Sequence, residues 1–222
     1  MDFRHEWKHE ITPGDMAALR RRLAAVARPD SHGQNGCYRI RSLYFDTPSD
    51  RALREKLDGV NRRDKYRIRL YDGDPSLIRL EKKSKVDGLC RKESAPLTEG
   101  EVRALLGGDW DWMARSGRDL VWELRCRMLN QLLRPRVIVD YRREAYVYAP
   151  GNVRVTLDSD VRTGLRSLEL LEPGGLTVSA GAPAILEVKW DAYLPDLIRD
   201  AVQLEGRRAS AFSKYALCRR YG

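Results

Sequence analysis

The stretch KYRIRLYDGDPSLIRLEKKSK, from Lys65 to Lys85, decides the fold of this chain. Its alternation of charged and apolar residues predicts two β-strands joined by a turn, because successive side chains of a strand point to opposite faces. One face of each predicted strand is crowded with charge and carries Arg67, Arg69, Glu81 and Lys83. A solvated sheet surface would account for such a face, and so would a tunnel that binds a polyanion.

The size and charge of the chain narrow the class of protein. Its 222 residues are enough for one large domain with its own core, and we expect a single domain over residues 1–222. The sequence holds 41 Lys and Arg against 32 Asp and Glu, a formal net charge of +9. This excess indicates an acidic partner: nucleic acid, an anionic membrane surface or a phosphorylated small molecule.

Cysteine and histidine indicate neither a disulfide framework nor a zinc site. The four cysteines are widely spaced and form no CxxC pair, which is typical of reduced thiols in an intracellular protein. His5 and His9 are four residues apart, but they lie in an alternating, strand-like segment and not in the helix that such a metal pair needs. No apolar stretch is long enough for a secretory signal or a membrane span. We therefore expect a cytoplasmic protein.

The same alternation recurs along the chain and predicts a sheet dominated by antiparallel strands. Further strands are expected in residues 3–11, 37–47, 88–97, 136–148, 153–158 and 184–190. Helices are expected at about residues 13–27, 49–57, 98–107, 120–133 and 195–204, with a last helical turn or two near the C-terminus. Trp122, Met128 and Trp190 are assigned to the core. The predicted fold class is α+β.

Charge gathers on one face of several predicted strands. Beyond the opening stretch, these faces carry Arg4, Glu6 and Lys8, then Arg154, Thr156 and Asp158, then Glu187 and Lys189. The alternation breaks at Arg142 and Arg143, where we expect a bulge. A one-sided sheet with its charged face in water remains one interpretation. If the sheet instead closes on itself, the charged face becomes a lumen and the apolar face packs on helices outside.

A lumen of this composition suits phosphate. Lys and Arg bind phosphate oxygens, and each guanidinium can do so through two parallel hydrogen bonds. Glu6, Glu81 and Glu187 could hold Mg²⁺ or Mn²⁺, which prefer oxygen ligands. The rival role for Glu187 is an internal salt bridge with Lys189 or an arginine. Asp158 is either a second metal ligand or a residue of a turn at the strand end, and the turn is favoured.

Eight short motifs resemble the polyphosphate-polymerase domain of the vacuolar transporter chaperone proteins. In chain order they are RHEWKHEI, SLYFDT, KYRIRLY, LEKKSK, VDYRREAYV, VRVTLD, ILEVKW and FSKY. They span about Phe3 to Tyr215, nearly the whole chain. That domain belongs to the triphosphate tunnel metalloenzymes, a superfamily shared with CYTH-type phosphatases. The resemblance implies a closed, eight-stranded antiparallel β-barrel with helices packed outside, and metal-dependent handling of triphosphates.

The resemblance also assigns roles to residues that match the motifs. The tunnel residues that contact phosphate match Lys8, Arg67, Arg69, Lys83, Arg143 and Arg154. Either Arg91 or Lys92 matches a further basic position, and we take Lys92. Ser213 and Lys214 match a Ser-Lys pair near the tunnel mouth, although Ser213 could equally start a helix. Glu187 matches the carboxylate that holds the metal, Mn²⁺ or Mg²⁺. Glu6 is added as a second ligand, and Lys189 as a phosphate-binding residue.

In the polymerase branch the tunnel binds ATP and transfers its γ-phosphoryl group to a growing polyphosphate, releasing ADP. The alternatives are a triphosphatase of the same fold and a non-catalytic module that binds polyphosphate or RNA. Hydrolytic relatives tend to carry ExExK in the first strand, whereas this chain has Arg4-x-Glu6-x-Lys8, which favours the polymerase. Tyr66 falls on the apolar face, which argues against a specific nucleic-acid partner. The expected ligands are ATP, triphosphate and polyphosphate, and coupling to a membrane would need a partner protein.

Overall fold

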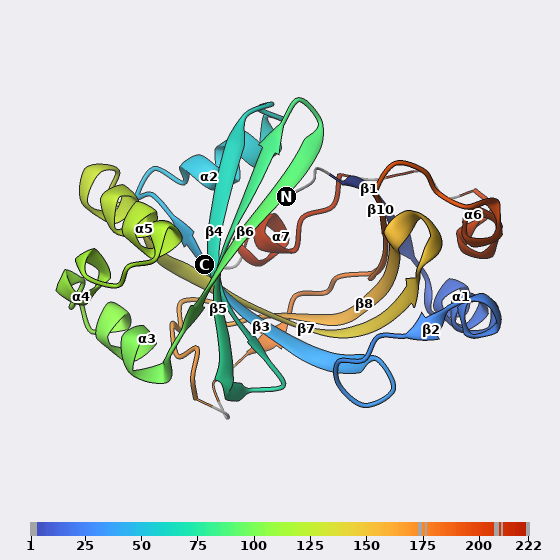
Figure 1. Ribbon diagram of the computed structural model, residues 1–222, viewed down its shortest axis with the longest axis horizontal. Coiled ribbons are helices and arrows are strands. Elements are labelled where there is room, and N and C mark those ends of the chain that lie inside the picture. Colours follow the sequence, from blue (N-terminus) through green and yellow to red (C-terminus); the bar gives the residue numbers. More distant parts are fainter. Residues whose placement is uncertain (1–3, 173–174, 176, 207–208, 210, 221–222) are drawn as a thin grey trace.

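The protein is an α+β structure built on one long, strongly curved antiparallel sheet (Figure 1). The computed structural model describes residues 4–172, 175, 177–206, 209 and 211–220. The sheet runs in the order β1-β10-β8-β7-β3-β4-β5-β6, with β2 paired to β7 and β9 paired to β8. The strands are β1 (His5–Ile11), β2 (Arg28–Pro29), β3 (Cys37–Asp46), β4 (Arg63–Tyr71), β5 (Asp74–Val86), β6 (Leu89–Leu97), β7 (Arg134–Tyr148), β8 (Val153–Thr163), β9 (Val178–Ser179) and β10 (Ala184–Trp190).

Helices cover the convex face of the sheet at its two ends (Figure 1). Those at one end are α3 (Glu99–Leu106), α4 (Asp111–Ala114) and α5 (Asp119–Asn130), and those at the other are α1 (Pro13–Val26) and α6 (Asp196–Val202). The remaining helices are α2 (Arg51–Leu57) and α7 (Lys214–Cys218). Helices α3, α4 and α5 pack on the apolar faces of β4 and β5, where Ile68, Leu80 and Leu124 are fully buried. Helices α1 and α6 pack on β8 and β10 around Leu19, Leu186 and Ile198. These two cores use the apolar faces that the strand alternation predicts.

The sheet is an open half-barrel, so the expected closed barrel is wrong. Its edge strands β1 and β6 share no ladder, and among the described residues only one isolated bridge joins the two sides, between Arg4 and Cys90. Helix α7 lies on the concave side, between the β4–β6 strands and β10 (Figure 1). Tyr215 and Cys218 of α7 pack there against apolar residues of β3, β7 and β8. The C-terminal segment therefore fills part of the space that edge-to-edge closure would need.

Local rules of chain geometry set most element boundaries. Helices α1 and α3 start with reciprocal capping boxes, Thr12 with Asp15 and Thr98 with Glu101. The register between β7 and β8 shifts between Asp140 and Arg142, which confirms the expected bulge. The short elements β2, β9 and α4 were not predicted, because two to four residues carry too little periodicity. In the part of the chain that the structure describes, no helix is long and apolar enough to cross a bilayer.

Candidate functional site

The concave face of the half-barrel encloses a cavity of about 770 Å³. Among the described residues that line it, fifteen are Lys or Arg and three are Glu. The expected lumen residues all reach it, whether from strands or from α7: Glu6, Lys8, Arg67, Arg69, Lys83, Lys92, Arg143, Arg154, Glu187, Lys189, Ser213 and Lys214. Positive charge of this density in a concave, partly enclosed site attracts an anion. The charged face is therefore a cavity wall and not a solvated sheet surface.

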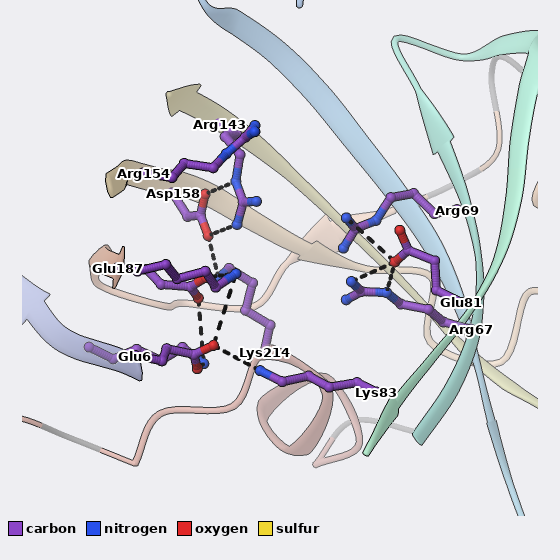
Figure 2. Close-up of polar contacts among 12 residues, drawn as sticks. Glu6, Arg67, Arg69, Glu81, Lys83, Arg143, Arg154, Asp158, Glu187 and Lys214 are labelled. Carbon is purple, nitrogen blue, oxygen red and sulfur yellow. Dashed lines mark hydrogen bonds and ion pairs between the residues drawn. The ribbon is translucent and has the colours of Figure 1, made fainter. Parts of the chain in front are cut away.

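Glu81 organises the cations of β4, β5 and β6. Arg67 lies directly opposite it in the ladder and donates from Nε to Glu81 Oε2 at 2.7 Å. Arg69 Nη1 lies 3.6 Å from the same oxygen, and Lys92 pairs with the other oxygen. Burial would raise the pKa of Glu81, but the three cations outweigh it and hold that pKa well below its usual range. Glu81 is thus an ionised internal counterion that fixes three phosphate-binding candidates, and Figure 2 shows it between Arg67 and Arg69.

Asp158 has the same role on the other side of the cavity. Arg143 donates to its two oxygens at 2.6 and 2.7 Å, and Lys214 Nζ donates at 2.6 Å (Figure 2). Its side chain is fully buried, and these cations lower its pKa against the effect of burial. The expectation of a turn residue was wrong, because β8 continues to Thr163. A role as a second metal ligand also fails to fit, because Asp158, unlike Glu6 and Glu187, is not among the residues that line the cavity.

Glu6 and Glu187 form a third cluster where β1 and β10 pair. Lys8, directly opposite Glu187, contacts both carboxylates, and Lys189 forms an ion pair with Glu187. Lys83 reaches across from β5 to Glu6 at 2.9 Å (Figure 2). Burial and Glu187 would raise the pKa of Glu6, but the lysines lower it to about 2. The same lysines and Arg143 keep the pKa of Glu187 well below its usual range, despite burial.

This cluster can be tested as a metal site. The described residues contain no group of three or more His, Cys, Asp or Glu side chains that could hold a metal ion. Glu6 and Glu187 are nevertheless adjacent, ionised and exposed to the cavity. Mg²⁺ is commonly held by one or two carboxylates, with substrate phosphates and water as its other ligands. The pair fits that arrangement, and the salt bridge between Glu187 and Lys189 is present as well.

Ser213, Lys92 and Arg154, which were also predicted as site residues, line the cavity. Ser213 caps α7, and its hydroxyl accepts a hydrogen bond from Ala216 N, so its helix-start role is present. Lys92 lies opposite Lys83 in the ladder and reaches Glu81, whereas Arg91 lies 3.7 Å from Glu93. Arg154 forms an ion pair with Asp30 and donates to the Tyr38 hydroxyl at 2.7 Å.

Several residues of the cavity were not predicted as site residues. The strand alternation places Lys65 on the charged face with Arg67, and Lys85 on the charged face with Lys83, but neither was assigned a role, and both line the cavity. Arg63, Lys56 and the aromatic residues Tyr44 and Tyr71 also line it and were missed. Arg63 could have been found, because it shares a strand face with Lys65. Lys56 lies on α2 and gives no such signal.

Comparison with known proteins identifies the family. The profile of the VTC domain matches residues 3–221. The chain belongs to the VTC domain family. Among solved structures it is similar to the PH1012 protein of Pyrococcus horikoshii OT3, with 15% identity, 96% of this chain and 98% of that chain covered, and a TM-score of 0.55. It is also similar to the bh2851 protein of Bacillus halodurans, named as an adenylate cyclase candidate, with 16% identity, 90% and 86% covered, and a TM-score of 0.51.

These structural likenesses show that this VTC domain shares its fold with the two proteins. The chain has no significant match among curated proteins.

Proposed function

We propose that this VTC domain is a metal-dependent phosphotransferase that moves the γ-phosphoryl group of ATP to the end of a polyphosphate chain and releases ADP. The observation that carries the proposal is the cavity lined by fifteen cations and three glutamates. A phosphate chain brings several negative charges in a row, and the cavity offers fixed cations on facing strands to receive them.

The chemistry needs positioning and charge neutralisation, and no covalent protein nucleophile. Arg143 uses Nε and Nη2 on Asp158, which leaves its Nη1 donors for a phosphate oxygen. Arg67 is held by Glu81 through Nε and by the Tyr44 hydroxyl through Nη1. Cations fixed in this way are already in place when charge develops on the transferred phosphoryl group, so little reorganisation is needed.

Glu6 and Glu187 would hold the divalent cation, which would supply positive charge against the phosphates. The protein's own contribution at this point is to keep both carboxylates ionised beside Lys8 and Lys189.

The acceptor is more consistent with phosphate than with water. Activating a water would require a carboxylate in addition to the pair Glu6 and Glu187. Among the described residues that line the cavity, the one other carboxylate is Glu81, which is held by three cations on the β4–β6 side. On β1 the position two before Glu6 is Arg4, whose Nε pairs with Asp191 at 2.7 Å. A polyphosphate end supplies its own nucleophilic oxygen, already ionised at neutral pH.

The test is to incubate the protein with ATP and Mn²⁺, and separately with tripolyphosphate and Mn²⁺, and to follow phosphorus NMR spectra. A growing mid-chain phosphate signal with ADP release is the expected result. Release of orthophosphate from tripolyphosphate without chain growth would refute the polymerase and indicate a triphosphatase. If the ligands stabilise the protein but neither is turned over, the cavity is a binding site without catalytic activity.

Glu187→Gln should reduce metal-dependent turnover by at least roughly 100-fold while the protein stays folded. The matched control is Glu10→Gln, because Glu10 is an exposed residue of β1 that does not line the cavity. Full activity in Glu187→Gln would remove this carboxylate from the mechanism.

A further inference from the structure

The cations of the cavity fall into two groups. Most have an internal carboxylate as partner, as Arg67 has Glu81, Arg143 has Asp158 and Lys8 has Glu187. The other group has no carboxylate within 4 Å among the described residues and consists of Lys56, Arg63, Lys65 and Lys85. All four are half-buried and line the cavity.

Strand register forces these uncompensated charges together. Arg63 lies directly opposite Lys85, and Lys65 directly opposite Lys83, in the ladder between β4 and β5. Like charges in directly opposed positions destabilise a sheet. Helix α2 adds Lys56 from the side, and the Lys65 ammonium lies 5.1 Å from the centre of the Tyr215 ring. A site that gathers cations at a cost to its own stability is arranged for an anion.

A second, smaller cavity of about 290 Å³ shows where this excess of positive charge ends. Arg63 and Lys85 line both cavities. Beyond them the second cavity carries Glu55 and Asp64 beside further arginines, so charges of both signs are present there. The uncompensated cations therefore form a bounded group at the α2 end of the main cavity.

We propose that Lys56, Arg63, Lys65 and Lys85 form a separate phosphate subsite that receives a phosphate group of a chain longer than a triphosphate. The inference rests on the proposed function in one respect, that the ligand of the cavity is a phosphate chain. No described carboxylate lies within ion-pair distance of these four cations, in contrast to the cations around Glu81 and Asp158, so all of their charge is available to a phosphate. The domain should therefore bind long chains more tightly than tripolyphosphate.

Occupation of the subsite should also be linked to proton uptake. Burial, together with the positive charges of Arg63, Lys56, Lys83 and Lys8, lowers the pKa of Lys65 to about 7. No described carboxylate faces Lys65 from α2, β1, β4, β5 or α7 within ion-pair distance. A bound phosphate places negative charge beside Lys65, which raises the pKa of its amine. The complex therefore takes up a proton.

The test is isothermal titration calorimetry without metal or nucleotide, near pH 7.5. The two ligands are tripolyphosphate and a purified linear polyphosphate several units longer, each titrated in buffers of different ionisation enthalpy. Near this pH a larger share of Lys65, whose pKa is about 7, is neutral than of Lys189, whose pKa is about 8. Most of the proton uptake with the long chain should therefore come from Lys65.

Lys56→Gln and Lys85→Gln should each weaken the long chain by roughly ten-fold, the value of one charged hydrogen bond, and tripolyphosphate by much less. Lys65→Arg should keep the affinity for the long chain and lose more than half of the proton uptake, because arginine stays charged. Arg21→Gln on the exposed face of α1 removes the same charge and should change neither quantity.

If Lys56→Gln and Lys85→Gln weaken the binding of both ligands equally, or weaken neither, the four cations do not form a separate subsite. Unchanged proton uptake in Lys65→Arg would rule it out as well, and this variant preserves the charge that the fold experiences. Since no turnover is measured, an enzyme that fails to polymerise can still pass this test, and a polymerase can fail it.

Discussion

Replacing Asp158 with asparagine tests whether internal carboxylates hold the cavity together. The substitution keeps the shape of the side chain and removes one negative charge from a fully buried position. Arg143 would lose the partner that it contacts at 2.6 and 2.7 Å, and Lys214 the partner at 2.6 Å. Two cations at the wall of the cavity would then face each other without a counterion.

Breaking a buried ion pair by removing one partner costs about 3–5 kcal/mol. Because two cations share Asp158, we expect the loss in free energy of unfolding to lie above the low end of that range. Because the cavity is open to water on one side, water can solvate Lys214 in the variant, and we expect the loss to lie below the high end. We expect Asp158→Asn to lower the free energy of unfolding by about 3–4 kcal/mol.

The loss should depend on pH in a defined direction. The pKa of Asp158 in the folded protein lies below its ordinary value of 3.8. The stabilisation is then fully present above that ordinary value and disappears as pH falls through the lower, folded-state pKa. The difference between wild type and variant should be largest near neutral pH and should shrink in acid.

Urea unfolding followed by circular dichroism, at neutral pH and again below pH 4, measures both effects. Asp200→Asn is the control, because Asp200 on α6 is 69% exposed and its ion pair with Arg199 is 3.7 Å long. It should change the stability by no more than about 0.5 kcal/mol. A loss under about 1 kcal/mol for Asp158→Asn, or a loss independent of pH, would refute the view that this carboxylate is a structural counterion.

Two further substitutions test the scaffold by urea unfolding. Leu124→Ala should cost about 2–5 kcal/mol, because Leu124 is fully buried under β4 and β5, whereas Leu129→Ala, at a position 48% exposed, should cost under about 1 kcal/mol. Thr12→Ala removes the hydroxyl that accepts from Asp15 N at the start of α1 and should cost about 1 kcal/mol; an unchanged midpoint would show that the capping box contributes nothing.

The strand faces could be predicted because a period of two residues is a local property. Lys65, Arg67 and Arg69 must share a face whatever the rest of the chain does. The same rule gave Glu187 with Lys189, and the cavity contains both. Helical faces are harder to assign from single residues. Trp122 was expected in the core and is 48% exposed, with the Arg125 guanidinium 5.7 Å from its ring centre, whereas Met128 and Trp190 are buried.

The ion-pair partner of each charged side chain and the openness of the sheet could not be predicted, because both depend on contacts between distant parts of the sequence. Lys83 donates to Glu6, which is 77 residues away in the sequence, and Lys214 donates to Asp158, which is 56 residues away. Neither pair follows from periodicity or spacing. Closure failed as a prediction for a related reason. The docking of Tyr215 against β3, β7 and β8 on the concave face is likewise a tertiary contact, and no local pattern predicts it.

The sharing of carboxylates explains how one wall can be both stable and ready for substrate. Glu81 is shared by Arg67, Arg69 and Lys92, so one negative charge fixes three cations and neutralises only one of them. If every cation had its own carboxylate, a phosphate chain would have to displace those carboxylates and leave them unpaired, at a large desolvation cost. With shared counterions, the remaining N–H groups donate to the substrate phosphates while the carboxylates keep the guanidinium groups in place. The cavity therefore stays net positive in the folded protein, and added phosphate lowers a repulsion that is already present.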